Sequence, residues 1–439
     1  MTNVYSPVEN IFCIPHADNF IVYAPLWGIL LQGNAQFVNL FYNALHGDED
    51  SLKEFGITNV DLFKSLNHAH PFVDAPSKSL PFTPTSVSLF LTTDCTLRCR
   101  YCYAHGGAAP VQMPWDMITD VLRQICGNAV SIQSDSISVQ FHGGGDMSAA
   151  WDLFVSAREY LHELTSPHKL PVVTSVGTNG ILNQEQRLWL MSHITGATVS
   201  IDGPSDIQDY QRPMSNGTSS FPAVYETLKT FDEHNYSYGI RTTITDQSVH
   251  RMEEIVSFFC QHFTVKKMKM EPMYLRGRAL KSPLKPPDTG TFVEQFRKAR
   301  KIAQRAGREL TYSGLRTEVV TNVFCKACGE SCAVTPDGWV TSCYEITDAH
   351  DPLSEIFFFG KYDCDSNRLV FDEERRQRLL NLSVENNFRC QKCFCKWHCA
   401  GDCPSKSTRF KEILPSGVTD RCYITRELTK DHLVEMLTT

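Results

Sequence analysis

The chain has 439 residues, of which 42% are hydrophobic and 21% charged, and its formal net charge is −7. This length allows two or three domains with a large core, and the composition is that of a folded chain rather than a disordered one. The negative charge and the lack of a long basic run argue against nucleic acid as the main partner, because phosphate binding depends on clustered Lys and Arg.

The first 75 residues are predicted to form a small α+β unit. A hairpin is expected over 20–32 with its turn near Pro25, followed by helices near 34–46 and 58–67. The apolar stretch 20–31 is too short to span a bilayer, and the N-terminus lacks the pattern of a signal peptide. We therefore expect a cytoplasmic protein that does not contact a membrane. The Pro- and Ser-rich stretch 74–86 predicts a linker.

From residue 86 to 306, β-prone segments alternate with helical ones. Strands are expected at 86–92, 136–141, 172–176, 198–201, 239–244 and 267–273. Helices are expected between them at 114–125, 149–163, 184–194, 221–234 and 251–261, and a loop at 276–290 precedes a helix at 291–306. This order predicts an α/β fold with a parallel sheet and outer helices. Six units fall short of the eight in a closed barrel, so we expect a partial (β/α)6 barrel that is open on one side.

Seventeen cysteines are distributed unevenly along the chain. Three lie at 95, 99 and 102, and eleven lie between 325 and 422. Disulfides are rare in a reducing cytosol, and a chain of this length does not need them for stability, so the clusters predict metal ligation. Cys13, Cys126 and Cys260 fall outside both clusters and are interpreted as small buried apolar residues.

Cys95, Cys99 and Cys102 follow the first predicted barrel strand with the spacing C-x3-C-x2-C. Loops at the carboxyl ends of barrel strands are where such folds hold their active sites. Three close thiolates can hold three irons of a [4Fe–4S] cluster and leave the fourth iron open, as a catalytic site requires. A zinc site with His105 as fourth ligand is the alternative that the spacing leaves open.

This motif, with Tyr101 before its last cysteine, resembles the radical S-adenosylmethionine (SAM) superfamily. Three further segments resemble motifs of that family in the expected order: FHGGGD at 141–146, TNG at 178–180 and VSIDGP at 199–204. The resemblance covers about 86–280. It implies a [4Fe–4S] cluster that binds SAM through its open iron.

The same resemblance implies which residues bind the cofactor. The candidates are Tyr101, Gly144, Gly145, Asp146, Asn179, Ser200 and Arg212. Asp146 stands where the family usually has Glu, so its carboxylate is one methylene shorter. Arg212 is the candidate partner of the methionine carboxylate, because a guanidinium donates two parallel hydrogen bonds to such a group. The alternative for each single residue is an ordinary turn residue or a solvated surface charge.

The second cysteine region, 324–423, resembles the SPASM extension found on many radical SAM enzymes. It contains Gly338-x4-Cys343 and then C-x2-C-x5-C-x3-C from 390 to 403. The resemblance implies two auxiliary [4Fe–4S] clusters. Their expected ligands are Cys325, Cys328, Cys343 and Cys403 for the first, and Cys390, Cys393, Cys399 and Cys422 for the second.

Three cysteines of this region exceed the eight that two clusters need. Cys332 competes with Cys325 for one position, and Cys364 and Cys395 are expected to be bystanders. A zinc ribbon is the alternative for the C-x2-C pairs. The stretch 332–343 also predicts a hairpin with an Asp-Gly turn, and a final helix is expected over 424–439.

The resemblance implies a radical SAM/SPASM peptide maturase with three [4Fe–4S] clusters. Such an enzyme generates a 5′-deoxyadenosyl radical, which removes a hydrogen atom from an unactivated C–H bond, while the auxiliary clusters carry electrons. The expected partners are a precursor peptide and a reductant such as flavodoxin or ferredoxin. The N-terminal unit resembles a leader-peptide-binding domain, and a plain N-terminal cap is the alternative. Because SPASM enzymes most often act on peptides or proteins, the leading prediction is a C–C or thioether side-chain crosslink in a ribosomally synthesised peptide.

Two other functions stay open at this point. Anaerobic sulfatase maturases share the layout and oxidise Cys or Ser to formylglycine, with an Asp after the G-x4-C cysteine as base; here Tyr344 follows Cys343, and Glu345 comes next. The second is a non-catalytic iron–sulfur carrier or scaffold, against which the presence of Cys95, Cys99 and Cys102 counts. No residue is predicted as the catalytic base.

Overall fold

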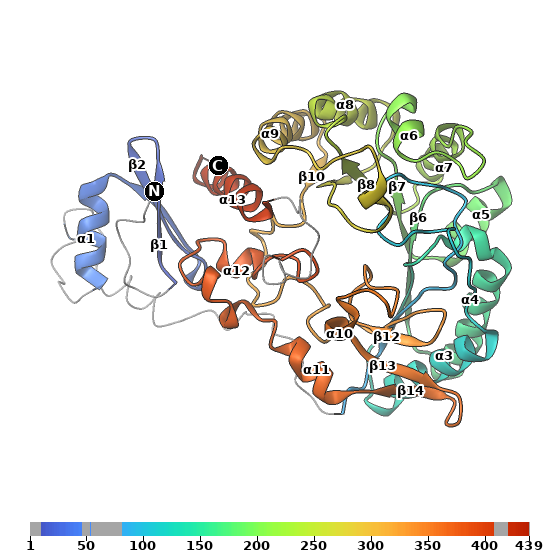
Figure 1. The fold of residues 1–439 in the computed structure, drawn as a ribbon. Coiled ribbons are helices and arrows are strands. Elements are labelled where there is room, and N and C mark those ends of the chain that lie inside the picture. Colours follow the sequence, from blue (N-terminus) through green and yellow to red (C-terminus); the bar gives the residue numbers. More distant parts are fainter. Residues whose placement is uncertain (1–9, 46–52, 54–80, 408–419, 439) are drawn as a thin grey trace.

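The computed structural model describes residues 10–45, 53, 81–407 and 420–438. Within these ranges the chain forms an eleven-stranded sheet in the order β10-β9-β8-β7-β6-β5-β4-β11-β12-β13-β14 and a separate three-stranded sheet (Figure 1). The predicted helix near 58–67 and most of the predicted linker lie outside the described residues. None of the described helices has the length and apolar character needed to cross a membrane.

The large sheet is parallel from β4 to β10 and curves into a partial barrel with helices on its outer face (Figure 1). Its strands are β4 (Ser86–Leu89), β5 (Ile137–Phe141), β6 (Val172–Thr178), β7 (Gly196–Ser200), β8 (Tyr238–Ile244), β9 (Lys267–Pro272) and β10 (Glu309–Thr311). The helices are α3 (Trp115–Ser131), α4 (Trp151–Thr165), α5 (Gln184–His193), α6 (Ser205–Gln211), α7 (Phe221–Glu233), α8 (Met252–His262) and α9 (Thr289–Arg305). The predicted partial barrel is confirmed, and β10 and α6 are additions to it.

The two faces of the barrel strands differ in chemistry, as the period of two along a strand requires. On β8, Ile240, Thr242 and Ile244 are buried beneath the outer helices, whereas Arg241 between them is exposed. On β9, Met268 and Met270 are buried in the same core. The apolar core therefore lies between sheet and helices, and the barrel interior is polar.

The barrel sheet continues into the cysteine-rich region. β11 (Ala333–Val334) pairs with β4 in parallel and with β12 (Trp339–Thr341) antiparallel, which confirms the predicted hairpin. Gly338 takes a left-handed φ of 84° in its turn, a conformation that glycine adopts without strain. The remaining elements are β13 (Phe358–Asp363), β14 (Arg368–Phe371), α10 (Ser354–Phe357), α11 (Glu373–Leu380), α12 (Lys396–Cys399) and α13 (Arg421–Thr438).

The predicted start of the final helix was wrong by three residues. α13 begins at Arg421, because the carboxylate of Asp420 accepts a hydrogen bond from the backbone N–H of Tyr423 and caps the first turn. Cys422 therefore lies in this first turn rather than in a preceding loop.

The N-terminal sheet consists of β1 (Phe12–His16), β2 (Asn19–Ala24) and β3 (Ile29–Gly33), followed by α1 (Ala35–Leu45). The predicted β2–β3 hairpin is confirmed, whereas β1, which contains Pro15, was missed. One face of the sheet packs against α1 and the other against the cysteine-rich region and α13. The indole of Trp397 donates a 2.9 Å hydrogen bond to the Asn10 side chain, and the Tyr23 hydroxyl contacts His398.

Candidate functional site

The first cysteine cluster occupies the loop that leaves β4, at the carboxyl end of the barrel. Burial raises the pKa of the Cys99 thiol to about 12 despite the opposing charge of Arg212, and the thiols of Cys102 and Cys95 add to the rise. Burial also raises the pKa of Cys95 to about 11. The structure therefore brings the three predicted thiols together in one desolvated site, where bound metal rather than bulk water would have to stabilise their thiolates.

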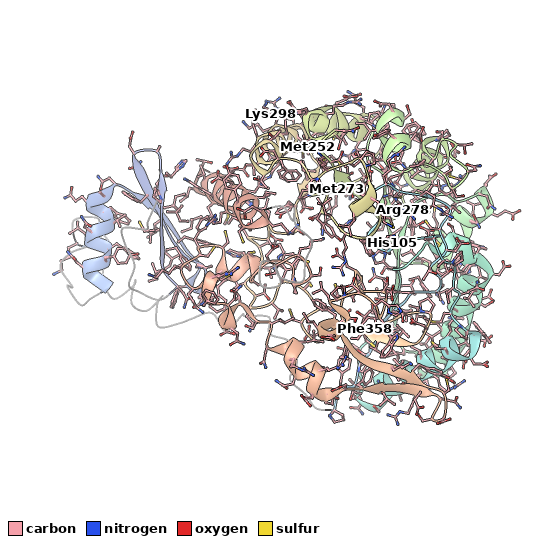
Figure 2. The ribbon with its side chains drawn as sticks, viewed as in Figure 1. His105, Met252, Met273, Arg278, Lys298 and Phe358 are labelled. Atoms are coloured by element: carbon pink, nitrogen blue, oxygen red, sulfur yellow. The ribbon has the colours of Figure 1, made fainter. Side chains whose placement is uncertain are left out.

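Two arginines hold the cysteine loop in shape. Arg98 donates to the carbonyl oxygens of Cys95, at 2.6 Å, and Gly107, at 3.0 Å. Arg278, on the 3-10 turn 277–281, donates to the carbonyl oxygens of Cys99 and Gly106 at 2.9 and 2.8 Å and lies near His105 (Figure 2). Their positive charges favour an anionic thiolate cluster. Sequence reasoning missed Arg278, because its partner is 179 positions away.

The FHGGGD segment packs directly against the cysteine loop. The N–H groups of Gly145 and Asp146 donate to the carbonyl oxygens of Thr92 and Asp94 at 2.9 and 2.8 Å. A Cβ on Gly145 would lie only 1.8 Å from the Asp94 oxygen, so no side chain fits there. Gly144 has a φ of 70°. At Gly145 the missing side chain thus permits contact between the two loops.

Asp146 joins the ends of two barrel strands. Its carboxylate accepts hydrogen bonds from the backbone N–H of Asn179 at 2.6 Å and of Ser148 at 3.0 Å, and from the hydroxyl of Thr178 at 3.3 Å. The Asn179 amide in turn donates to the Thr96 hydroxyl at 3.0 Å and lies 3.6 Å from the Cys95 sulfur. Asp146 therefore positions Asn179 against the cysteine loop.

Replacing Asp146 with alanine should destabilise the fold by about 2 kcal/mol, because buried donors, including the N–H of Asn179, lose their acceptor. Denaturant unfolding under anaerobic conditions measures this change. Asp152→Ala, on the solvent side of α4, is the control and should change the unfolding free energy by less than about 0.5 kcal/mol. An Asp146→Ala variant as stable as the unmodified protein would show that the carboxylate does not tie the strands together.

A buried polar chain lies beside Cys99. The Tyr101 hydroxyl donates to the Asp202 carboxylate at 2.5 Å, and Arg212 donates to the Tyr101 oxygen at 2.9 Å. The Nε atom of Arg212 is buried and finds no hydrogen-bond partner among the described residues. Burial raises the pKa of Asp202, and the Arg212 charge opposes this rise. Sequence reasoning missed Asp202, although it lies in the VSIDGP segment.

Ser200 is the last residue of β7, and its register partner is Arg241 on β8. Among the described residues, no hydrogen bond joins its side chain to the cysteine loop. Its partly buried side chain lies on the polar inner face of the barrel.

The residues at the carboxyl end of the barrel fit a [4Fe–4S] cluster with a bound cofactor. Gly106 lies beside two of the three cysteines, because a Cβ there would lie 3.3 Å from the Cβ of Cys95 and 3.8 Å from the Cys102 sulfur. The unused N–H of Arg212 offers a donor for an acceptor group at the same place. In the described part of the chain, no three His, Cys, Asp or Glu side chains are already arranged around a single metal ion.

The first auxiliary set also comes together. Desolvation raises the pKa of Cys325 well above its ordinary value, and the neighbouring thiols of Cys403, Cys328 and Cys343 raise it further. Cys332 immediately precedes β11 and is buried in the apolar core, where desolvation alone raises its pKa to about 12. Cys325 thus interacts electrostatically with the other three thiols, whereas burial alone acts on the pKa of Cys332.

The second auxiliary set surrounds the start of α13. Burial and the Asp402 charge raise the pKa of Cys399, and the thiols of Cys393, Cys422 and Cys390 act in the same direction. The four predicted thiols are therefore neighbours. Cys395 is an additional, buried neighbour whose hydrogen bond lowers the pKa of Cys393 to about 7.

The cysteines that were not predicted to be ligands occupy different surroundings. Cys364 is exposed in the connection between β13 and β14. Cys13 and Cys126 are buried, as predicted, and Cys260 is partly buried.

A cavity of about 560 Å³ lies between the two cysteine regions. Its wall includes Tyr103 and His105 of the cysteine loop, Arg276, and Glu345, two residues after Cys343. Glu345 forms a 2.8 Å ion pair with Lys406 and accepts a 2.8 Å hydrogen bond from the Ser405 hydroxyl. Although burial acts in the opposite direction, the Lys406 charge lowers the pKa of Glu345 to about 2. Glu345 is therefore ionised at neutral pH and a poor proton acceptor.

Changing Glu345 to glutamine should lower the free energy of unfolding by about 3 kcal/mol, because Lys406 is left buried without its counter-charge. The double variant Glu345→Gln/Lys406→Met should recover part of this loss, since it removes both charges. Anaerobic denaturant unfolding of the three proteins measures both effects. A double variant that shows the sum of two independent losses would contradict the pairing.

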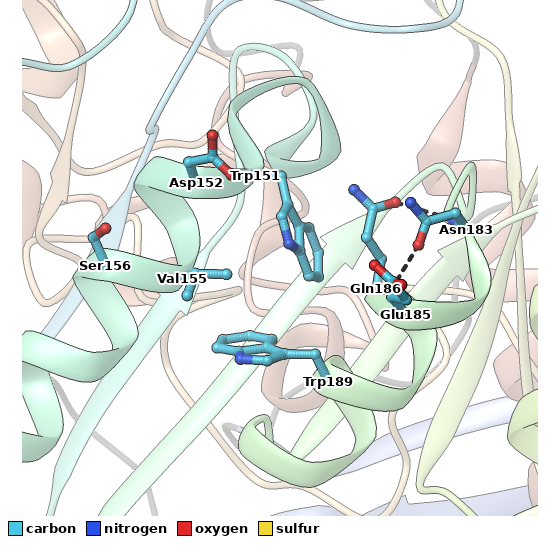
Figure 3. A pocket seen from close by; sticks show the side chains of 8 residues that line it. All are labelled: Trp151, Asp152, Val155, Ser156, Asn183, Glu185, Gln186 and Trp189. Atoms are coloured by element: carbon cyan, nitrogen blue, oxygen red, sulfur yellow. Dashed lines mark hydrogen bonds between the residues drawn. The ribbon is translucent and has the colours of Figure 1, made fainter.

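Another groove, of about 510 Å³, lies on the outside of the barrel between α4 and α5 (Figure 3). Trp151 and Trp189 line it with their rings edge to face at 5.5 Å. No predicted site residue lines it, so it plays no part in the candidate site.

Comparison with known proteins identifies the barrel. Residues 89–259 match the Radical SAM superfamily, and this range contains the cysteine loop and all the predicted cofactor contacts. Residues 89–259 are a radical SAM domain, and the protein is a radical SAM enzyme. The alternative of a non-catalytic carrier is thereby set aside. Domains of this superfamily use a [4Fe–4S] cluster with SAM, the group that the site fits.

The relatives of this radical SAM enzyme are distant in sequence, but their similarity to it extends over much of the chain. The cysteine-type anaerobic sulfatase-maturating enzyme of Clostridium perfringens is 22% identical over 349 residues, which is 75% of this chain and 89% of the relative. The serine-type enzyme of Klebsiella aerogenes is 23% identical over 71% of this chain and 77% of its own. The sporulation killing factor maturation protein SkfB of Bacillus subtilis is 22% identical over 45% of this chain and 48% of its own.

Solved structures share the fold. Native anSMEcpe with bound AdoMet and Cp18Cys peptide superposes with a TM-score of 0.61 at 18% identity, covering 80% of this chain and 98% of its own. Streptococcus suis SuiB bound to S-adenosylmethionine superposes with a TM-score of 0.52 at 15% identity, covering 94% and 99%. At these identities the likeness concerns the fold alone.

Proposed function

We propose that this radical SAM enzyme is a peptide maturase that forms a C–C or thioether crosslink between side chains of a ribosomally synthesised peptide. One observation carries the proposal: the cavity of about 560 Å³ is bounded on one side by the cysteine loop and on the other by the segment after Cys343. The pKa of Tyr103, which lies in the cavity wall, is raised mainly by burial and by the charge of Glu345. The charges of Cys102 and Cys343 add to this rise, so Tyr103 lies near a cysteine of each region. A substrate there would lie between a radical source and an electron acceptor.

The ligands proposed for the three clusters are those that the fold groups together. Cys95, Cys99 and Cys102 would hold the catalytic cluster, and the two auxiliary sets would hold the others. When bound, the catalytic cluster and SAM would supply the radical that removes hydrogen from the substrate. Tyr101 and Asp202 hold Arg212 beside Cys99, where its free N–H can orient the cofactor. Asn179, fixed by Asp146, borders the same site.

The proposed partners follow from this arrangement. A precursor peptide would occupy the cavity, and the N-terminal sheet, which rests on the cysteine-rich region, would receive its leader by strand addition. A flavodoxin or ferredoxin would supply the first electron, in the cytoplasm. The anSMEcpe structure with a bound Cp18Cys peptide supports a peptide substrate, because its fold covers 80% of this chain.

The experiment begins with anaerobic reconstitution, reduction and measurement of 5′-deoxyadenosine. The neighbouring genes are searched for a short open reading frame, and the peptide that it encodes is co-expressed with the enzyme and analysed by mass spectrometry. We expect a loss of two hydrogens and a linkage between two side chains in the fragment spectrum. A mass that is unchanged in H2O but increases by about one dalton in D2O would indicate epimerisation and contradict the crosslink.

Formylglycine formation is the second candidate, because the anaerobic sulfatase-maturating relatives match over 71–75% of the chain. The two residues that follow Cys343 do not favour it. The Tyr344 hydroxyl donates to Gln140 at 2.9 Å and accepts from Ser88 at 2.9 Å, and Glu345 is paired with Lys406. Incubation with a cysteine peptide from a sulfatase, followed by a hydrazide reagent, tests this candidate. An aldehyde in the product would favour formylglycine formation over crosslinking.

A further inference from the structure

Two cations lie side by side on the inner face of the barrel. Arg241 on β8 and Lys269 on β9 are register partners in adjacent parallel strands. Both strands are flanked on each side, β8 by β7 and β9, and β9 by β8 and β10. The alternate residues Ile240 and Met268 are buried under the outer helices. The two cationic side chains therefore point into the barrel.

Both side chains are exposed although their strands are internal. Because the outer face of the sheet is covered, this exposure requires an open space inside the barrel. The surroundings are nevertheless protein: desolvation lowers the pKa of Lys269. Arg241 is close enough to Glu345 and Tyr103, two residues of the cavity wall, for charge interactions with both. Arg241 thus lies near the wall of the proposed substrate cavity, and Lys269 lies beside Arg241 on the next strand.

The carboxylates near the pair are already bonded to other cations. Glu271 accepts two hydrogen bonds from Ser313, at 2.8 and 3.0 Å, and lies 3.4 Å from Arg421. Glu345 pairs with Lys406. Within the described ranges, neither Arg241 nor Lys269 forms a direct ion pair. Two adjacent cations in a partly desolvated space repel each other, and an anion between them would relieve this repulsion.

We propose that Arg241 and Lys269 form a recognition site for a carboxylate of the substrate peptide, which makes an acidic peptide the preferred substrate class. This inference rests on the proposed peptide-maturase function and names the substrate for the same site. A guanidinium can bind one carboxylate through two parallel hydrogen bonds, and the ammonium adds a point charge. An Asp or Glu side chain held there would place a neighbouring residue in the cavity between Tyr103 and Glu345.

The test is a binding measurement on the anaerobically reconstituted enzyme. Two dye-labelled, end-capped peptides are compared by fluorescence anisotropy, one alternating Asp with Gly and the other Asn with Gly. The wild-type enzyme should bind the Asp peptide at least about tenfold more tightly, the effect of one charge-assisted contact. Arg241→Gln/Lys269→Met should remove this preference. Lys298→Met, on the outer helix α9 (Figure 2), removes one positive charge outside the barrel and should leave the preference intact.

A charge-reversal variant provides a second, independent test of the proposed site. Arg241→Glu/Lys269→Glu should bind a peptide that alternates Lys with Gly more tightly than the Asp peptide. Equal binding of the Asp and Asn peptides by the wild-type enzyme would overturn the proposal, and this comparison requires no variant to fold. Because 5′-deoxyadenosine formation is measured separately, an inactive enzyme that still prefers the Asp peptide would refute the maturase function and leave the recognition site standing.

Discussion

Changing Cys95, Cys99 and Cys102 together to alanine is expected to abolish reductive cleavage of SAM, with a loss of at least about 10³-fold in 5′-deoxyadenosine formation. The three thiols are the donors that the cysteine loop brings together beside Arg212 and Asn179. Without them no iron is held where the cofactor would bind. The iron content should fall by about four per chain, since one cubane is lost and the auxiliary sets are untouched.

The matched control for this variant is Cys126→Ala. Cys126 is buried in α3 and lies outside both cysteine regions, so its loss should cost some stability but no iron. Iron and sulfide analysis, electron paramagnetic resonance of the reduced proteins and chromatography of 5′-deoxyadenosine are compared for both variants. A triple variant that keeps its full iron load, or a wild-type site that takes up zinc on reconstitution, would contradict the assignment of these thiols to a catalytic cubane.

The barrel was predictable because its signal is local. Apolar residues that alternate along β8 and β9, and helical stretches between the strands, follow from the burial of one face of each element. β1 and β10 escaped prediction for opposite reasons. β1 contains Pro15, which counts against a strand, and β10 has only three residues. Both are strands because neighbours from elsewhere in the chain pair with them.

The residues of the candidate site also differ in how far the sequence predicts them. Cys95, Cys99 and Cys102 are recognisable from their spacing, which lies within a single loop. Arg278 and Asp202 have no comparable signal, because their roles depend on contacts with residues 179 and 101 positions away. The different surroundings of Cys325 and Cys332 likewise come from tertiary packing, since both cysteines lie upstream of the same Asp-Gly turn.

Changing Cys325 to alanine is expected to remove the first auxiliary cluster, whereas Cys332→Ala is expected to retain it. Cys325 lies with Cys403, Cys328 and Cys343, but Cys332 is buried in the apolar core beside β4. Removing one of four thiolates opens the cubane to solvent and loss of iron. The Cys325→Ala protein should therefore lose up to about four irons per chain and, if the auxiliary cluster accepts the substrate electron, nearly all peptide modification.

The two variants form a matched pair, because each removes one sulfur within the same segment. Cys332→Ala should lower the free energy of unfolding by about 1–2 kcal/mol through the small cavity it leaves, with the iron content unchanged. Uncoupled cleavage of SAM should continue in both proteins, since Cys95, Cys99 and Cys102 stay in place. A reversed result, with iron lost from Cys332→Ala and kept in Cys325→Ala, would show that cluster binding moves Cys332 out of the core. The register of β11 against β4 would then have to change on cluster binding, because the carbonyl of Cys332 accepts the 2.8 Å hydrogen bond from Ser88 that joins these two strands.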